Sequence, residues 1–143
     1  MKPNILIITA NFYKDISLDL TNSAIMELKT KAKFNEIVVP GVFEIPVVIA
    51  KNIKKYDAFI ALGCVIRGKT PHFNFISKSV TEAIMNLSVN YKKPIGNGII
   101  TCLNKKQALE RSHVGKKNKG DDAARAVLSV LGILRNESKW SAS

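Results

Sequence analysis

The stretch AFIALGCVIRGKTPHF, residues 58–73, holds the pattern that decides the fold of this chain. Residues 58–64 form an unbroken apolar run, as expected of a strand that is buried on both faces of a sheet. A turn containing Gly68 follows, and Thr70 and Pro71 then suit the N-cap and the first position of a helix. A helix directly after a buried strand is typical of a parallel sheet, because parallel strands need a crossover between them.

The same alternation continues on both sides of this stretch. Apolar residues recur at helical spacing in the longer segments, for example Leu20, Ala24 and Leu28. The pattern predicts strands over 4–10, 35–39, 58–64 and within 94–103, and helices over 17–33, 45–54, 70–91, 105–111 and 119–136. We therefore expect one α/β domain over 1–143, with a four-stranded parallel sheet, helices on both faces, an ordered core at about 4–136 and a short C-terminal tail.

Composition excludes several classes of protein. No apolar run approaches the roughly 18 residues of a membrane helix, and residues 5–10 lack the flanking features of a signal peptide. The two cysteines, Cys64 and Cys102, are far apart and form no CxxC pair, so a metal site is not expected. These features predict a cytoplasmic protein with reduced thiols and no membrane partner.

The net charge of +11 permits anionic partners. Most of the lysines are scattered along the chain, and only Lys116, Lys117 and Lys119 form a dense group. A nucleic-acid-binding module is one hypothesis, and it predicts strongly salt-dependent binding. Mixed acidic, aromatic and basic residues near the strand ends favour a small-molecule pocket instead, so no nucleic acid is expected.

Residues suited to ligand binding follow each predicted strand. In open parallel sheets, ligands bind outside the carboxyl ends of the strands. The residues at those ends are Phe12 after the first strand, Phe43 and Glu44 after the second, residues 65–72 after the third and residues 104–119 after the fourth. We therefore expect the functional site at this edge of the sheet.

The turn before the third long helix fits an anion site. Backbone N–H groups at a helix start favour an anion, and Lys69 and Thr70 add a charge and a hydroxyl. The helix dipole disfavours a charged His72 whereas a bound phosphate favours it, so this histidine fits either a proton carrier or a surface residue.

Other residues have two interpretations each. Glu44 suits either hydroxyl recognition or a favourable position in the first turn of a helix. Arg111 and Lys119 suit either phosphate binding or a solvated basic loop. Phe12 is either a core residue or a surface on which a ring stacks.

Five blocks together resemble the lumazine synthase family. They are residues 10–12 (ANF), 39–46 (VPGVFEIP), 63–73 (GCVIRGKTPHF), 98–101 (GIIT) and 107–124, which includes NKG at 118–120. Their order and spacing match the family from near residue 4 to near residue 136. The resemblance implies a flavodoxin-like fold with strand order 2-1-3-4, and a homopentamer or icosahedral shell with active sites between subunits. It also implies riboflavin synthase as a partner and no cofactor.

The implied reaction joins 5-amino-6-(ribitylamino)uracil to 3,4-dihydroxy-2-butanone 4-phosphate, with loss of phosphate and water. The resemblance gives individual roles: Phe12 stacks on the pyrimidine; Val42, Phe43 and Glu44 bind the ribityl chain; Cys64, Val65 and Ile66 bind the pyrimidine edge; Lys69, Thr70, Arg111 and Lys119 bind the phosphate; His72 is the acid–base residue.

The chain departs from the family pattern at the ring pocket. Asn11 and Tyr13 flank Phe12 where the family often has Arg and Asn, and Asn97 stands where a second aromatic residue often lies. A catalytically weak flavin-binding or lumazine-binding protein on the same scaffold is therefore the alternative to a transferase.

Overall fold

A computed structural model describes residues 1–68, 72–113 and 118–141, with side chains described as far as residue 136. The strands are β1 (Asn4–Ala10), β2 (Lys33–Val39), β3 (Ala58–Ile66) and β4 (Ile95–Cys102). The helices are α1 (Lys14–Leu28), the 3-10 helix η1 (Val42–Glu44), α2 (Ile45–Asn52), α3 (His72–Tyr91), α4 (Lys105–Ser112) and α5 (Lys119–Ser141). Residues 69–71, which include Lys69 and Thr70, lie outside the described residues.

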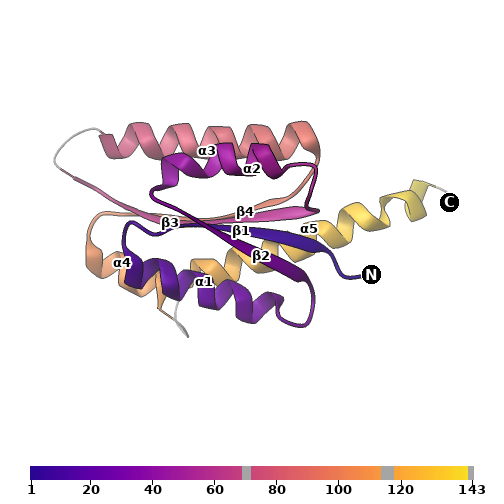
Figure 1. Cartoon of the computed structure of the whole chain (residues 1–143), viewed down its shortest axis with the longest axis horizontal. Coiled ribbons are helices and arrows are strands. Elements are labelled where there is room, and N and C mark those ends of the chain that lie inside the picture. Colours follow the sequence, from indigo (N-terminus) through magenta and orange to yellow (C-terminus); the bar gives the residue numbers. More distant parts are fainter. Residues whose placement is uncertain (69–71, 114–117, 142–143) are drawn as a thin grey trace.

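The four strands form one parallel sheet in the order β2-β1-β3-β4. Ile7 of β1 pairs with Ile60 of β3, and Cys64 of β3 pairs with Ile100 of β4. Helices α2 and α3 cover one face, whereas α1, α4 and α5 cover the other (Figure 1). The predicted α/β fold, its strand order and its three layers are confirmed.

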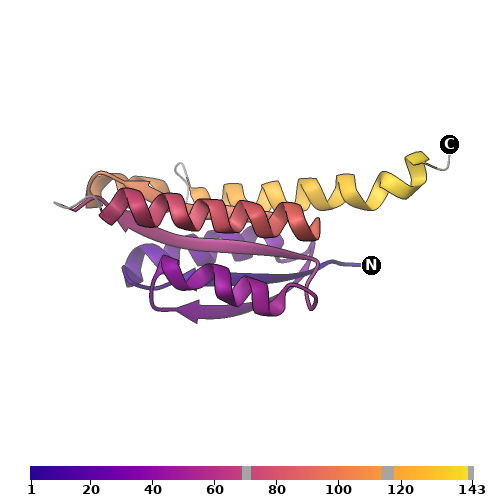
Figure 2. The ribbon, with the colours of Figure 1, turned by 90° about the horizontal axis from the view of Figure 1, so that it is seen from above.

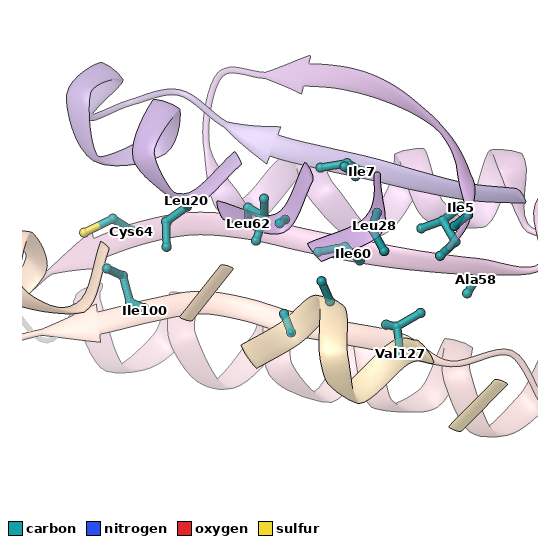
Figure 3. Packing of buried hydrophobic residues seen from close by; sticks show 14 of the residues in the cluster. Ile5, Ile7, Leu20, Leu28, Ala58, Ile60, Leu62, Cys64, Ile100 and Val127 are labelled. Atoms are coloured by element: carbon teal, nitrogen blue, oxygen red, sulfur yellow. The ribbon is translucent and has the colours of Figure 1, made fainter. Parts of the chain in front are cut away.

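The central strands are buried on both faces, as their unbroken apolar runs predict. In β1, Ile5 and Ile7 face the layer of α1 and α5, and Leu6 and Ile8 face the layer of α2. Figure 3 shows the first of these layers, where side chains of β1, β3 and β4 meet those of α1 and α5. Burial on both faces places β1 and β3 at the centre of the sheet. Because all four strands are parallel, their carboxyl ends lie at one edge of the sheet.

The first helix differs from its predicted range of 17–33. It begins at Lys14, because the N–H of Ser17 already donates to the carbonyl of Tyr13 (2.9 Å). It ends at Leu28, whose carbonyl accepts the N–H groups of both Lys31 and Ala32. Lys33 then belongs to β2, so the predicted helix was too long at its C-terminal end and the predicted strand too short. The helical spacing of apolar residues does not reveal that a polar turn of this kind ends the helix.

Helix α5 continues beyond the sheet on the side of the N-terminus (Figures 1 and 2). The Arg135 guanidinium donates to the carbonyl of Met1 (2.8 Å) and lies 3.8 Å from the Asp57 carboxylate. Within the described ranges, no helix combines the length and the apolar character needed to cross a membrane.

Candidate active site

The carboxyl ends of β1, β2 and β3 surround a cavity of about 530 Å³. Four segments contribute to its walls: the β1–α1 connection, the loop and η1 after β2, the end of β3, and the first turns of α3. The lining residues are Phe12, Tyr13, Gly41, Val42, Phe43, Glu44, Cys64, Val65, Ile66, His72 and Ile76. Most of them are apolar, and the polar groups are few, which is typical of small-molecule sites.

Beside the cavity, Gly63 of β3 lies very close to the side chains of Val42 and Ala10. A Cβ atom on Gly63 would lie 2.7 Å from Val42 Cγ1 and 3.2 Å from the Ala10 Cβ, so only glycine fits there with Val42 in place. The N–H of Asn11 donates to the carbonyl of Val39 (3.0 Å), which ties the connection after β1 to the end of β2. These contacts bring the segments that carry Phe12 and Phe43 to one side of the sheet edge.

Two aromatic side chains are unusually open to solvent at the cavity. Phe12 is 73% exposed and Phe43 is 62% exposed. The Tyr13 ring meets the Phe12 ring edge-to-face, with centroids 4.9 Å apart and an interplanar angle of 82°. Phe12 is therefore not a core residue, and its exposed ring suits stacking with a flat ligand.

Glu44 is half-buried at the end of η1. One carboxylate oxygen lies 3.0 Å from the position that a Cβ atom on Gly41 would take, so the carboxylate folds over the turn that begins η1. Within the described ranges this carboxylate has no ion-pair partner. It is consequently available to accept hydrogen bonds from ligand hydroxyl groups.

Cys64 forms part of the wall as a neutral thiol. Burial, with smaller contributions from the Cys102 thiol and the Asp15 carboxylate, raises the pKa of the Cys64 thiol to about 12. Burial and the neighbouring Cys64 also raise the pKa of Tyr13. A thiol that keeps its proton at neutral pH is a poor nucleophile, so the buried Cys64 side chain contributes packing to the wall.

His72 is the first residue of α3 and lies exposed at the cavity. Its imidazole reaches the same space as the ring of Phe12 and the carboxylate of Glu44, because α3 starts at the carboxyl edge of the sheet. The ring is thus within the cavity in which a ligand would need a proton donor or acceptor.

Three expected residues do not line this cavity: Asn97, Arg111 and Lys119. Asn97 is exposed on β4, where its Oδ1 accepts the N–H of Ile99 (3.1 Å). Lys119 begins α5, and its Nζ lies 4.0 Å from the Asp122 carboxylate.

Arg111, the third of these residues outside the cavity, lies near the end of α4. Its Nη1 donates to the carbonyl of Thr101 (2.9 Å) and lies 3.8 Å from the sulfur of Cys102. These two contacts hold the guanidinium at the carboxyl end of β4, the edge strand next to β3. The expected residues of one chain therefore fall into two sets: those that line the cavity and those that lie outside it.

Sequence analysis missed three residues of the cavity wall, namely Tyr13, Gly41 and Ile76. Ile76 follows His72 by four residues and therefore lies on the same helix face, which the helical period would have indicated. Tyr13 and Gly41 carry no such signal, because their positions depend on the packing of β1 against β2. No cluster of three or more metal-ligating side chains occurs in the part of the chain that the structure describes.

Comparisons with known proteins point to a single family. The family model described as 6,7-dimethyl-8-ribityllumazine synthase matches residues 2–135. The chain is 46% identical to 6,7-dimethyl-8-ribityllumazine synthase 1 of Rhodopseudomonas palustris, over 94% of this chain and 88% of that protein. It is 44% identical to the 6,7-dimethyl-8-ribityllumazine synthase of Bartonella tribocorum, over 92% of this chain and 90% of that protein. The protein of that name from Agrobacterium fabrum is 42% identical, over 92% of this chain and 95% of that protein.

Proposed function

The chain belongs to the 6,7-dimethyl-8-ribityllumazine synthase family and shares its function in riboflavin biosynthesis, and we propose that the reaction takes place in the cavity described above. The observation that carries this proposal is that one cavity collects eight of the expected site residues from four separate segments. They are Phe12, Val42, Phe43, Glu44, Cys64, Val65, Ile66 and His72.

The ribitylaminouracil binds deepest in the proposed site. Its flat ring stacks on the exposed ring of Phe12, and backbone groups of residues 64–66 bind the edge of the ring. Its ribityl hydroxyls bind backbone groups of Val42 and Phe43 and the carboxylate of Glu44. The half-buried position of Glu44 supports this role, since hydrogen bonds to a charged group strengthen when water is partly excluded.

The phosphorylated butanone binds through cations from two subunits. Lys69 and Thr70 belong to the same chain as the cavity, whereas Arg111 and Lys119 come from a neighbouring copy, whose Asn97 lies at the ring pocket. This division is supported by the position of Arg111, which is bound at the end of β4 and not in the cavity of its own chain. A guanidinium and an ammonium together suit a phosphate dianion, which needs several charge-assisted hydrogen bonds.

His72 moves protons during the condensation. The amine of the pyrimidine attacks the ketone, and water leaves as the imine forms. The carbon next to the imine then loses a proton as phosphate leaves from the carbon beyond it, and the resulting enol becomes a ketone. The ribitylamino nitrogen condenses with this ketone, and a second water leaves as the ring closes. Both the imine step and the elimination need a proton carrier that operates near neutral pH, and imidazole meets this requirement. Holding two reactive molecules in contact supplies a large part of the remaining rate.

This shared site requires an oligomer; the assembly we propose is a homopentamer, with an icosahedral shell of pentamers as its larger form. Helix α3 supports self-association, because it exposes Phe75, Met85 and Val89 and buries only Val80 and Ile84. We place the protein in the cytoplasm, with riboflavin synthase, which acts on lumazine, as its protein partner.

The test is an initial-rate assay with both substrates, following the lumazine chromophore against the uncatalysed background. We expect a rate well above background, a lower turnover with His72→Ala, and with Arg111→Ala a higher KM for the phosphorylated substrate. Wild-type kinetics in both variants would contradict the assignment of the site. Tight flavin binding by a folded oligomer that forms no lumazine would support the binding-protein alternative and would direct attention to Asn97.

A further inference from the structure

Asn118 is a buried polar side chain with all of its hydrogen-bonding capacity in use. It is 5% exposed. Its Nδ2 donates to Ser23 Oγ (2.7 Å) and to the carbonyl of Ser112 (2.6 Å). Its Oδ1 accepts the backbone N–H groups of Gly120 (2.8 Å) and Asp121 (3.2 Å).

These partners require an asparagine. The Ser112 carbonyl can only accept, and the two backbone N–H groups can only donate, so the orientation of the amide is determined by its partners. An aspartate would place a second oxygen against the Ser112 carbonyl, and a serine would serve the N–H groups of α5 without reaching Ser112. Capping of α5 and the link to α4 are therefore two separable contributions of one side chain.

The link joins the segments that carry the two proposed phosphate-binding cations. Ser112 is the last residue of α4 and directly follows Arg111, whereas Lys119 is the first residue of α5 and directly follows Asn118. The amide thus closes the connection between the two helices at both of its ends.

The closed connection is also anchored on α1. Ser23 lies on α1, and a Cβ atom on Gly120 would come within 2.1 Å of the Leu20 carbonyl, so the start of α5 packs directly on the α1 backbone. The Ser23–Asn118 bond spans 95 residues of sequence. Both ends of the connection are consequently held against the main body of the domain.

We propose that Asn118 is the positioning residue of the anion site, because it links the end of α4, which carries Arg111, to the start of α5, which carries Lys119. The inference rests on the function proposed above for those two cations. Without the link from Asn118 to Ser112, each segment is still held on the domain, but the two lose the direct hydrogen bond between them and can shift relative to each other. Holding them in place before the ligand arrives removes that reorganisation from the cost of binding.

The test compares Asn118→Ser and Asn118→Ala with the wild-type oligomer, using inorganic phosphate as a competitive inhibitor against the phosphorylated butanone. We expect phosphate inhibition to weaken about five- to tenfold in both variants, with the KM for the pyrimidine unchanged. Asn118→Ser retains the cap of α5 but leaves the buried Ser112 carbonyl unpaired, so its melting temperature falls less than that of Asn118→Ala while its phosphate inhibition weakens to the same extent. Ser23→Ala is the matched control, because it breaks the bond to α1 and leaves the link to Ser112 intact.

Arg111→Ala and Lys119→Ala distinguish the two proposals. If these variants do not weaken phosphate inhibition, the assignment of the cations is wrong and Asn118 has no anion site to position. If they weaken it while a folded Asn118→Ser protein binds phosphate as the wild type does, the positioning role is overturned. Equal losses for phosphate and pyrimidine in Asn118→Ser would indicate general destabilisation and would also contradict it.

Discussion

The ring of Tyr13 stands edge-on to the ring of Phe12, with centroids 4.9 Å apart and planes at 82°. Tyr13 is half-buried and Phe12 is mostly exposed, so the buried ring supports the exposed one from the side. A single edge-to-face contact covers at most one face of the Phe12 ring, so the other face stays open for a ligand. The contact with Tyr13 therefore restrains the Phe12 ring in a position that suits stacking with a ligand.

Replacing Tyr13 with alanine should weaken binding of the pyrimidine by loosening Phe12. An aromatic pair of this kind is worth about 0.5–1.5 kcal/mol, so the KM for the pyrimidine should rise about two- to tenfold with little change in kcat. Steady-state kinetics with the phosphorylated substrate held saturating would measure this. Tyr13→Phe retains the ring edge and should stay close to wild type; a loss as large as that of Tyr13→Ala would show that the hydroxyl matters instead.

Adding one methyl group at Gly63 should destabilise the protein. The new Cβ would lie 2.7 Å from Val42 Cγ1, and the buried Val42 must move to accommodate it. Overpacking of this kind costs about 1–3 kcal/mol, which urea denaturation would detect. Gly68→Ala is the control, since among the described residues, its chain neighbours apart, no atom lies within 4 Å of its Cβ position. Combining Gly63→Ala with Val42→Ala should recover part of the loss, and the absence of any recovery would count against this contact as the cause.

The raised pKa of Cys64 should make the protein less stable at alkaline pH. In the unfolded chain the thiol loses its proton near pH 9.0, whereas in the folded protein it keeps the proton to about 12. Between these values the folded state binds one more proton, so the free energy of unfolding falls by about 1.4 kcal/mol per pH unit as the pH rises. Below pH 9 this contribution is constant.

Cys64→Ala removes the titrating thiol and therefore this part of the pH dependence. Chemical denaturation of both proteins across the alkaline range would show a steeper decline for the wild type, with the two curves parallel below pH 9. Curves that stay parallel throughout would mean that Cys64 titrates normally in the folded protein.

Two impaired variants should partly restore activity to each other, at a phosphorylated-substrate concentration that limits Arg111→Ala, if each site is shared between subunits. His72→Ala damages the cavity side of a site, and Arg111→Ala damages the side that the neighbour supplies. In a randomly mixed ring of the two variants, about one quarter of the sites receive both intact sides. Co-expression with two affinity tags, followed by assay of the doubly purified oligomer, would measure this. If the mixed oligomers show no more activity than the two variants assayed separately, Arg111 and His72 belong to the site of the same chain.

Local patterns in the chain were enough to predict the layers of the fold. Unbroken apolar runs mark β1 and β3 as central strands, since only strands covered on both faces bury every side chain. Placement of Phe12, Glu44 and His72 at the carboxyl edge followed from the parallel arrangement, because all four strands end at the same edge. The strand order itself came from the family resemblance, because spacing alone does not decide which strands are neighbours.

Contacts between distant parts of the chain settled the remaining features. The approach of Val42 to Gly63 and the bond from Asn118 to Ser23 both depend on how segments far apart in sequence pack. The separation of Arg111 from the cavity of its own chain has the same origin, since the guanidinium is bound by the end of β4. Hydrophobic period and capping residues encode local conformation, whereas distances across the sheet edge arise only when the layers pack together.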